Sequence, residues 1–439
     1  MMRTLGLMRT LAALTITFAL GPVSSARGDC PDAMSGSWTG TLAFRDEPLA
    51  IDLDVNVSPR ATARASFPEL VRYEQPLKIE CEAARARLSL PFGLGDALLD
   101  ISDGQLAGTS DIGAELSMRA ATPRTLRRTH HEIAEVAGES VMGTLVRPDS
   151  SGPFPLVLVL AGSGNPVRAN AGYAGWADWF AHRGFAAFVY DRPTDEVELD
   201  GRLLTIADHA ALVIQALNRL GELSDIRSDG AGLFGRSRGA WIAFEAAGND
   251  ARFAWLAGTG SSALGAIDQN LAASRQVLAN AELSASERAD AMAVQTLHAL
   301  TAENPELWPR LAAALANRKE VWADLVNQPR DPEDLGWFAA HASHRPADAI
   351  AQLDVPVFLA WGANDRVTPA ETNQALFEVL LPPEFEHELH IYPGVGHGLE
   401  GPLNTDGDEE IVWSGTSPAF IVDLERWLAR RMPTAPTNH

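Results

Sequence analysis

The 439-residue chain is poor in positive charge and in long apolar runs, and it has only two cysteines. Its 35 Lys and Arg residues against 57 Asp and Glu give a formal net charge of −22, which repels phosphate backbones and anionic membrane surfaces. We therefore expect no nucleic-acid partner. Beyond residue 26, no stretch reaches the ~18 uninterrupted apolar residues that a spanning helix needs, so no stable membrane insertion is expected. The sequence also lacks a phosphate-binding G-x-x-x-x-G-K-S/T loop, internal repeats and low-complexity tracts.

The remaining composition is that of a folded protein. Hydrophobic residues make up 46% of the chain and charged residues 21%. At about 150 residues per domain, the length predicts two or three structural units with enough apolar mass for a sizeable core. One large domain and one small domain would satisfy this length.

The N-terminal segment has the features of a secretory signal peptide. Arg3 and Arg9 precede a mostly apolar run over residues 11–20, and small residues follow at 23–26. A basic start, an apolar middle and a small-residue cleavage site are typical of such peptides. The alternative is a membrane anchor, but about ten apolar residues are too few to cross roughly 30 Å of hydrocarbon. We expect residues 1–26 to be removed on export and the mature protein to be secreted or periplasmic.

Cys30 and Cys81 are the only cysteines, and export would place both in an oxidising compartment where disulfides persist. A disulfide between them is the natural expectation. It would close a loop of about 50 residues and stabilise the fold by roughly 4 kcal/mol in the entropic model. Two unpaired cysteines that act as small hydrophobic residues are the alternative.

The pattern of the chain changes near residue 126. Over residues 27–126, apolar and polar residues alternate in short stretches such as 49–57, and turn signals such as Asp103-Gly104 separate them. This pattern predicts a small domain of half-buried antiparallel strands. Over residues 127–435, short apolar runs alternate with amphipathic helices, as in a mostly parallel sheet covered on both faces. The predicted strands of this second domain are 156–160, 186–190, 230–234, 253–256, 355–361 and 388–392.

One segment interrupts this alternation. Residues from about 266 to 347 are rich in alanine and charge, have a helical pattern and contain Trp308, Trp322 and Trp337. They separate two predicted strands that a single crossover helix would connect. We interpret the segment as a helical cap inserted over the carboxyl edge of the sheet, with an ordinary surface excursion as the alternative.

Ser237 lies in Gly235-Arg-Ser-Arg-Gly239, the only G-x-S-x-G sequence of the chain. The motif directly follows a predicted strand and precedes a predicted helix. At such a sharp turn, glycines leave room beside a serine that is held in a strained backbone. A serine hydroxyl is a weak nucleophile, so it needs a histidine base and an acid that orients the imidazole.

Asp365 and His397 are the candidates for these two roles. Asp365 follows a predicted strand, and Thr368-Pro-Ala-Glu371 predicts a capping box that begins the next helix. His397 lies in a glycine-rich loop after the last predicted strand. Because the carboxyl ends of parallel strands share one edge of a sheet, we expect Ser237, Asp365 and His397 to meet there, in that chain order.

A hydrolytic serine also needs donors for the negative charge that develops on the carbonyl oxygen, each worth a few kcal/mol. One donor should be the backbone N–H of Arg238, directly after the nucleophile. The other should come from Ala161-Gly-Ser-Gly164, with the N–H of Ser163 as the candidate, because small residues let the backbone approach a substrate closely.

Taken together, these motifs resemble the α/β-hydrolase superfamily over residues of about 130 to 435. More narrowly, the chain resembles two-domain serine esterases, in which a small β-rich domain precedes the hydrolase. The residues that carry the resemblance are Ala161–Gly164, Tyr190–Pro193, the turn at Ser237, the loops of Asp365 and His397 and, for the first domain, Gly36–Leu42. The resemblance implies a doubly wound, mostly parallel sheet with a helical cap, and hydrolysis of carboxylic esters, often short-chain, without a metal or organic cofactor.

The sequence departs from the family pattern at two places. Ala161 stands where relatives commonly have histidine, and Arg236 and Arg238 flank the nucleophile, where uncharged or smaller residues are usual. Two guanidinium groups would either bind an acidic group of the substrate, with Arg236 as a candidate substrate-binding residue, or pair with local carboxylates. Pairing is favoured, and the acidic residues 406–410 are candidate partners.

No metal site is expected. His130 and His131 are adjacent, so on a strand they point to opposite faces, and His341 and His344 lack a third ligand nearby. The sequence therefore predicts a serine esterase that acts on a small-molecule ester. A peptidase or acyl thioesterase with the same triad, and a non-catalytic binding protein that retains the fold, are the alternatives. The natural substrate, the role of the first domain and the oligomeric state stay open.

Overall fold

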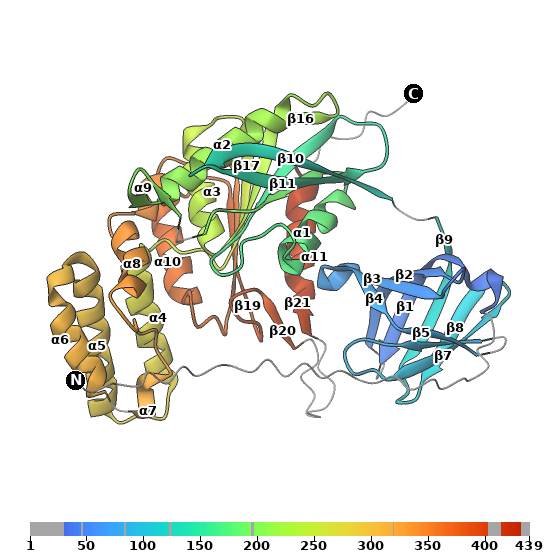
Figure 1. The fold of residues 1–439 in the computed structure, drawn as a ribbon, viewed down its shortest axis with the longest axis horizontal. Helices are drawn as coiled ribbons and strands as arrows, with labels where there is room; N and C mark the ends of the chain where they lie inside the picture. The colour runs from blue at the N-terminus through green and yellow to red at the C-terminus, as the bar shows by residue number, and fades with distance from the viewer. Residues whose placement is uncertain are drawn as a thin grey trace, which may run out of the picture.

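The computed structural model describes residues 30–44, 47–82, 85–122, 125–194, 197–318, 320–402 and 414–431. The expected signal peptide and the acidic residues 406–410 lie outside them. The described chain forms a small β-rich domain and a larger domain in which helices cover a central sheet (Figure 1). Among the described residues, no helix has both the length and the apolar character required to cross a membrane.

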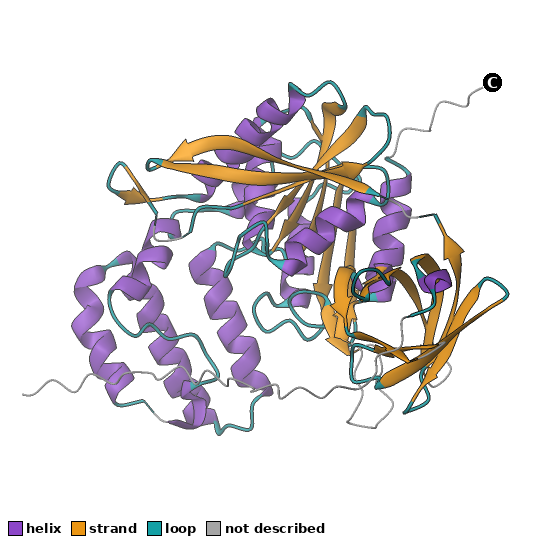
Figure 2. Ribbon diagram, turned by 45° about the vertical axis from the view of Figure 1, so that its right-hand side comes forward, coloured by secondary structure: helices purple, strands orange, loops and turns teal. Residues whose placement is uncertain are grey.

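The first domain is one nine-stranded antiparallel sheet with the order β4-β3-β2-β1-β9-β8-β7-β6-β5. In β2, Ile51, Leu53 and Val55 are buried while Asp52 and Asp54 are exposed, which is the alternation that predicted strands here. The two edge strands follow each other in the chain, and the sheet curls around a single apolar core (Figure 2). Its strands are β1 (Gly36–Phe44), β2 (Glu47–Asn56), β3 (Thr62–Phe67), β4 (Arg72–Leu77), β5 (Ile79–Glu82), β6 (Arg85–Ser89), β7 (Asp96–Ser102), β8 (Gln105–Ser110) and β9 (Glu115–Ala121), with short 3-10 turns η1 (Asp32–Met34) and η2 (Pro68–Leu70).

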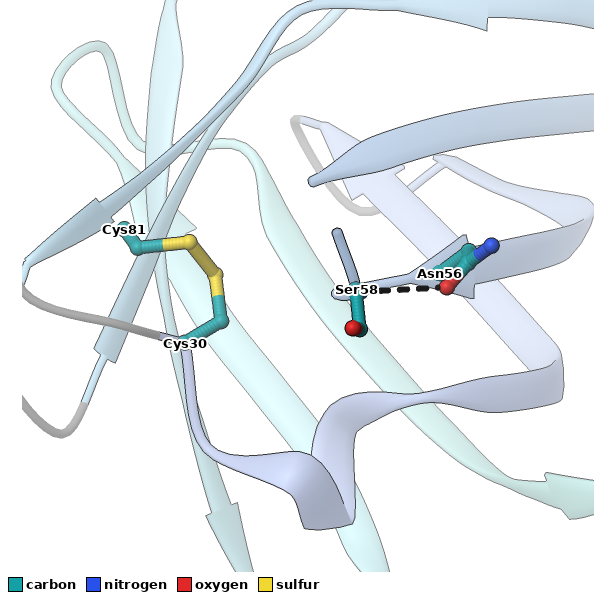
Figure 3. Close-up of a disulfide and its surroundings, with 4 residues drawn as sticks. All are labelled: Cys30, Asn56, Ser58 and Cys81. Carbon is teal, nitrogen blue, oxygen red and sulfur yellow. Dashed lines mark hydrogen bonds between the residues drawn. A yellow bond between two sulfur atoms is a disulfide. The ribbon is translucent and has the colours of Figure 1, made fainter. Parts of the chain in front are cut away.

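Cys30 and Cys81 form a disulfide in the structure (Figure 3). Cys81 lies on the edge strand β5, so the bridge ties this edge to the segment that precedes β1. That segment is also held by a hydrogen bond from Trp38 Nε1 to the Met34 carbonyl at 3.0 Å. Nearby, the Ser58 N–H donates to Asn56 Oδ1 at 3.2 Å (Figure 3).

The larger domain contains an eight-stranded sheet with the order β10-β11-β13-β12-β16-β17-β18-β19. β11 runs antiparallel to both of its neighbours. Six strands, β13, β12, β16, β17, β18 and β19, run parallel to one another. The strands are β10 (Leu126–Val136), β11 (Glu139–Pro148), β12 (Phe154–Leu160), β13 (Ala186–Tyr190), β16 (Ile226–Arg236), β17 (Phe253–Thr259), β18 (Val357–Gly362) and β19 (His387–Tyr392). Two small ribbons pair β14 (Glu198–Leu199) with β15 (Arg202–Leu203) and β20 (Glu400–Pro402) with β21 (Ser414–Thr416).

Helices cover both faces of this sheet, and each face has its own apolar core. α1 (Ala171–Ala181) and α11 (Pro418–Ala429) pack on one face. α2 (Ile206–Gly221), α3 (Arg238–Asn249) and α10 (Ala370–Leu380) pack on the other. The helical spacing of apolar residues predicts α2, and its first turn is fixed by a capping box between Thr205 and Asp208. The predicted α/β fold is thereby confirmed.

The segment between β17 and β18 is helical and has a core of its own. Leu278, Leu311, Leu315 and Trp322 are buried in this core. Figure 1 shows α4 to α7 beyond one end of the sheet, away from the small β domain. The helices are α4 (Ala266–Asn280), α5 (Ala285–Glu303), α6 (Trp308–Ala316), α7 (Glu320–Ala323), α8 (Gly336–His341) and α9 (Pro346–Ile350), with turns η3 (Pro305–Leu307) and η4 (Glu333–Leu335).

Candidate active site

Ser237 lies at the sharp turn between β16 and α3. Its backbone has φ 53° and ψ −121°, a conformation that non-glycine residues rarely adopt and that concentrates at functional sites. The Ser237 N–H donates to the Thr259 carbonyl at 2.8 Å, which fixes the turn against β17. A Cβ on Gly235 or Gly239 would lie within 2.6 Å or 2.2 Å of backbone oxygen, so both motif glycines are required by close packing.

Asp365 and His397 meet at the same edge of the sheet, in the loops after β18 and β19. His397 Nδ1 is 2.8 Å from Asp365 Oδ2, and the Asp365 side chain is fully buried. Its other oxygen, Oδ1, accepts the N–H groups of Val367 at 2.8 Å and Thr368 at 2.7 Å. Because Nδ1–H is donated to the carboxylate, the lone pair of the neutral imidazole is on Nε2.

The predicted capping box at Thr368 is wrong. α10 has Pro369 as its N-cap, and no side chain caps it. The Thr368 hydroxyl instead donates to the Gly260 carbonyl at 3.2 Å, while its N–H is held by Asp365. The threonine therefore joins the acid-bearing loop to the end of β17 rather than starting the helix.

The loop that contains Ser163 passes beside Ser237. A Cβ on Gly162 would lie 3.1 Å from Ser237 Cβ. The Gly162 N–H donates to the Tyr173 hydroxyl at 3.0 Å, and the Gly162 carbonyl accepts from Arg192 Nη2 at 3.0 Å. Sequence reasoning assigned no role to these two side chains, although Arg192 lies in the quoted Tyr190–Pro193 motif. The available signal was an arginine two residues after a predicted strand, in the same motif.

Arg238 connects this loop to the turn of Ser237 and to the helices between β17 and β18. Its Nε and Nη2 donate to Ser163 Oγ at 3.1 Å and 3.0 Å, and its guanidinium lies 5.0 Å from the centre of the Trp337 ring in α8. The Arg238 N–H is in the first turn of α3, where backbone donors have no acceptor within the helix. Both residues expected to supply backbone donors therefore line the cavity that contains Ser237.

Arg236 also lines this cavity, but its guanidinium is engaged. Nη2 donates to the Gly398 carbonyl at 3.2 Å and lies 3.8 Å from Glu400 Oε1. The Arg236 side chain is 16% exposed. These contacts link the turn of Ser237 to the loop of His397. Arg236 therefore has a local carboxylate, Glu400, as a neighbour, which agrees with the favoured interpretation of the sequence.

The cavity has a volume of about 940 Å³, near the upper end of the roughly 300–1,000 Å³ usual for small-molecule sites. Loops of the sheet provide Ser237 and His397, α4 and α8 provide a wall, and the small β domain contributes Arg72. Within the described ranges, no group of three His, Cys, Asp or Glu side chains is placed to hold a metal ion. His130 Nδ1 contacts Thr144 Oγ1 at 3.0 Å and His341 Nδ1 contacts the Trp337 carbonyl at 2.8 Å, so these rings have structural partners.

Comparison with known proteins gives one family match, in which residues 330–412 fit the dienelactone hydrolase family. This range includes Asp365 and His397. An uncharacterized 31.7 kDa protein in the traX-finO intergenic region of Escherichia coli is 23% identical over 263 residues, 58% of this chain and 86% of that protein. Hydrolase tropI of Talaromyces stipitatus is 32% identical over 73 residues, 16% of this chain and 28% of that protein. The solved dienelactone hydrolase from Anabaena variabilis is 15% identical, with a TM-score of 0.40 over 70% of this chain and 99% of that chain.

The fold and the family match agree. Counted from β10, the strand order of the larger sheet is 1-2-4-3-5-6-7-8 once the ribbon β14–β15 is set aside, with the second strand antiparallel. The G-x-S-x-G turn follows the fifth strand, as in the α/β-hydrolase arrangement. The family match supports hydrolase activity. By its sheet topology, the larger domain has the α/β-hydrolase fold, and a small β domain precedes it in the chain.

Proposed function

We propose that the protein is a serine hydrolase that cleaves carboxylic esters through an acyl-enzyme. The observation that carries the proposal is the hydrogen bond between His397 and the buried Asp365, at a cavity that also contains Ser237 in a strained turn. A nucleophile, a base and an orienting acid on loops that follow three strands of one sheet, β16, β19 and β18, are the parts that acyl transfer needs.

In this mechanism, Ser237 Oγ attacks the ester carbonyl while His397 Nε2 takes the hydroxyl proton. The backbone N–H groups of Ser163 and Arg238 hold the resulting oxyanion. His397 then gives its proton to the departing alcohol, which leaves an acyl group on Ser237. Water attacks this acyl group with His397 as the base, and the acid is released. Asp365 keeps the imidazole in the required tautomer and stabilises its charged form throughout.

The same machinery would accept an amide or a thioester, so the choice of an ester needs separate support. The match to the dienelactone hydrolase family supplies it, because a dienelactone is a cyclic ester. The preference for short acyl chains rests on the sequence resemblance, and the cavity of about 940 Å³ offers more room than a short acyl group alone needs. Acyl-chain length is therefore a quantity for the experiment to determine.

The test is hydrolysis of a p-nitrophenyl ester series, acetyl to palmitoyl, by the wild type and by Ser237→Ala. We expect the variant to lose roughly 10³-fold or more in kcat and to keep the circular dichroism spectrum and Tm of the wild type. A fluorophosphonate probe should label the wild type alone. Retained activity in Ser237→Ala would rule out the mechanism. Activity confined to amides or thioesters favours the alternative hydrolases, and absence of both turnover and labelling favours a non-catalytic binding protein.

A further inference from the structure

The small β domain is docked onto the hydrolase domain through the segment 68–74, which comprises η2 and the start of β4. Val71 and Tyr73 are 4% and 8% exposed and belong to the same apolar cluster as α1 and α11. The Tyr73 ring stacks on His182, with 5.0 Å between ring centres. Residues of the first domain are thus part of the second domain's core.

Backbone packing and charge fix this segment further. The Val71 carbonyl oxygen would lie 2.5 Å from a Cβ at Gly175 in α1, so the two backbones touch. Arg128 Nη2 lies 2.7 Å from Asp178 Oδ1 and 3.7 Å from Glu74 Oε1, which joins the domains by charge. Arg72 lies between these anchored neighbours, so its position relative to the active site is set by the docking.

Arg72 faces the active-site cavity as a partly buried cation. In the described part of the chain, its side chain has no hydrogen bond or ion pair. Arg236 and Arg238, by contrast, are bonded to Gly398 and Ser163. A cation that is held in a cavity without a carboxylate is a ready binding group for an anion.

The charges around the cavity also favour an anionic ligand. Its described lining contains four arginines, at positions 72, 236, 238 and 366, and a single carboxylate. That carboxylate, Glu400, lies beside Arg236. The described part of the cavity wall therefore has a net positive charge, in a chain whose formal charge is −22. Arg366 also lines it, but its side chain is exposed.

We propose that Arg72 is a specificity-determining residue, supplied by the N-terminal domain, that binds a carboxylate on the ester substrate. The proposal rests on the proposed esterase function and assigns the substrate class of the same site. The planar guanidinium binds a carboxylate through two parallel hydrogen bonds, which a lysine does not reproduce. The N-terminal domain is then a wall of the active site rather than an independent module.

The test compares two esters of similar length, p-nitrophenyl butyrate and the mono-p-nitrophenyl ester of succinate. Arg72→Gln should lower kcat/KM for the succinate ester roughly 10- to 100-fold, mainly through KM, because one charge-assisted contact is lost. Activity on the butyrate ester should stay within about twofold, and Arg72→Lys should recover part of the loss. Arg119→Gln, an exposed arginine on β9, is the matched control and should behave as the wild type.

Two further variants make the result decisive. Gly175→Ala should displace Val71 and reduce the preference for the succinate ester over the butyrate ester. Gly248→Ala in α3 should leave this preference unchanged, because its Cβ would be 3.8 Å from its nearest neighbour. If Arg72→Gln leaves the ratio of kcat/KM for the succinate ester to kcat/KM for the butyrate ester unchanged, the proposal is overturned. It is also overturned if Arg366→Gln lowers this ratio and Arg72→Gln does not. If neither ester is hydrolysed, the esterase function fails. The role of Arg72 is then decided by calorimetry, which measures the affinity of the succinate ester for Ser237→Ala and for the double variant that also carries Arg72→Gln. Equal affinities of the two variants overturn the proposed role of Arg72.

Discussion

At the residue scale, the position of His397 depends on Gly260, which directly follows β17. Gly260 has φ +57°, and its N–H donates to the Ala360 carbonyl at 2.9 Å. A Cβ at this residue would lie 2.8 Å from Cε1 of the His397 ring and 3.0 Å from the His397 carbonyl oxygen. The glycine therefore provides both the left-handed backbone and the space that the histidine occupies.

We expect Gly260→Ala to lower kcat of ester hydrolysis by roughly 10- to 100-fold, because a displaced imidazole no longer aligns with the nucleophile. KM should change little, since the cavity walls that hold the substrate are elsewhere. Steady-state kinetics on the p-nitrophenyl ester that the wild type hydrolyses fastest measures both. Gly248→Ala is the control of the same chemical type, and wild-type kcat in Gly260→Ala would contradict the assigned role of His397.

The candidate catalytic residues were accessible from the sequence because each lies in a loop motif directly after a strand. Ser237, Asp365 and His397 could be placed at one sheet edge on that basis alone. Arg72 could not, because it lies in an ordinary β-strand sequence. Its approach to the cavity comes from contacts with α1, about 100 residues further along the chain. Such contacts leave no local pattern.

At the element scale, α5 contains a buried histidine without a polar partner. His298 is 2% exposed, and in the described part of the chain neither ring nitrogen is hydrogen-bonded. Its ring packs edge-on against Phe338 in α8, with 5.0 Å between centres. Burial lowers the pKa of His298 from 6.5 to about 4, so the ring is neutral in the folded cap.

This pKa shift gives the cap an acid-sensitive element. In the unfolded chain His298 takes up a proton near pH 6.5, but in the fold only near pH 4. Its contribution to stability is therefore full above pH 6.5 and is lost as the pH falls toward 4, by up to about 3 kcal/mol. Since Trp337 in the neighbouring α8 packs on Arg238, loosening of the cap would disturb the candidate active site.

We expect His298→Phe to flatten the dependence of Tm on pH between 7 and 4.5, because phenylalanine fills a similar volume and does not titrate. Thermal unfolding followed by circular dichroism at several pH values measures the effect. The flattening will be partial, because burial also lowers the pKa of His344 to about 4. Curves of the same slope for the variant and the wild type would refute the assignment.

Helices and strands were predicted with unequal success for a physical reason. Apolar residues at helical spacing over 206–220, after Thr205 as a cap candidate, form a local pattern that predicts α2, and the structure adds a capping box with Asp208. The start of α10 was misjudged because Thr368 has a tertiary partner, the Gly260 carbonyl, that competes with capping. The resemblance implied a doubly wound, mostly parallel sheet but no strand order was predicted, because pairing such as that between β12 and β16 joins segments that are distant in the chain.

At the scale of the whole molecule, the disulfide and the N-terminal segment both bear on the location of the protein. We propose that the protein is exported to the periplasm or the medium; the basic and apolar residues at the start of the sequence and the Cys30–Cys81 bridge support this. The bridge spans a sequence separation of 51 residues, and in the entropic model it contributes about 4 kcal/mol.

We therefore expect the exported protein to begin near residue 27, and to show no free thiol when it is unfolded without reductant. Intact mass and thiol titration measure these two properties. Reduction should lower the stability of the N-terminal domain, visible as a lower denaturant midpoint. Two titratable thiols in the unreduced exported protein would contradict the role of the bridge, and a chain of full mass would contradict removal of a signal peptide.

The first and last strands of the nine-stranded sheet, β1 and β9, are paired with each other at its centre. The domain therefore closes within its own stretch of sequence, and one backbone connection, between Ala121 and Leu126, leads to the eight-stranded sheet. A single recombination event at that point of a gene would add or exchange this domain together with Arg72. Selectivity and chemistry would then be inherited as separate units, because Ser237, Asp365 and His397 all lie on the other side of the junction.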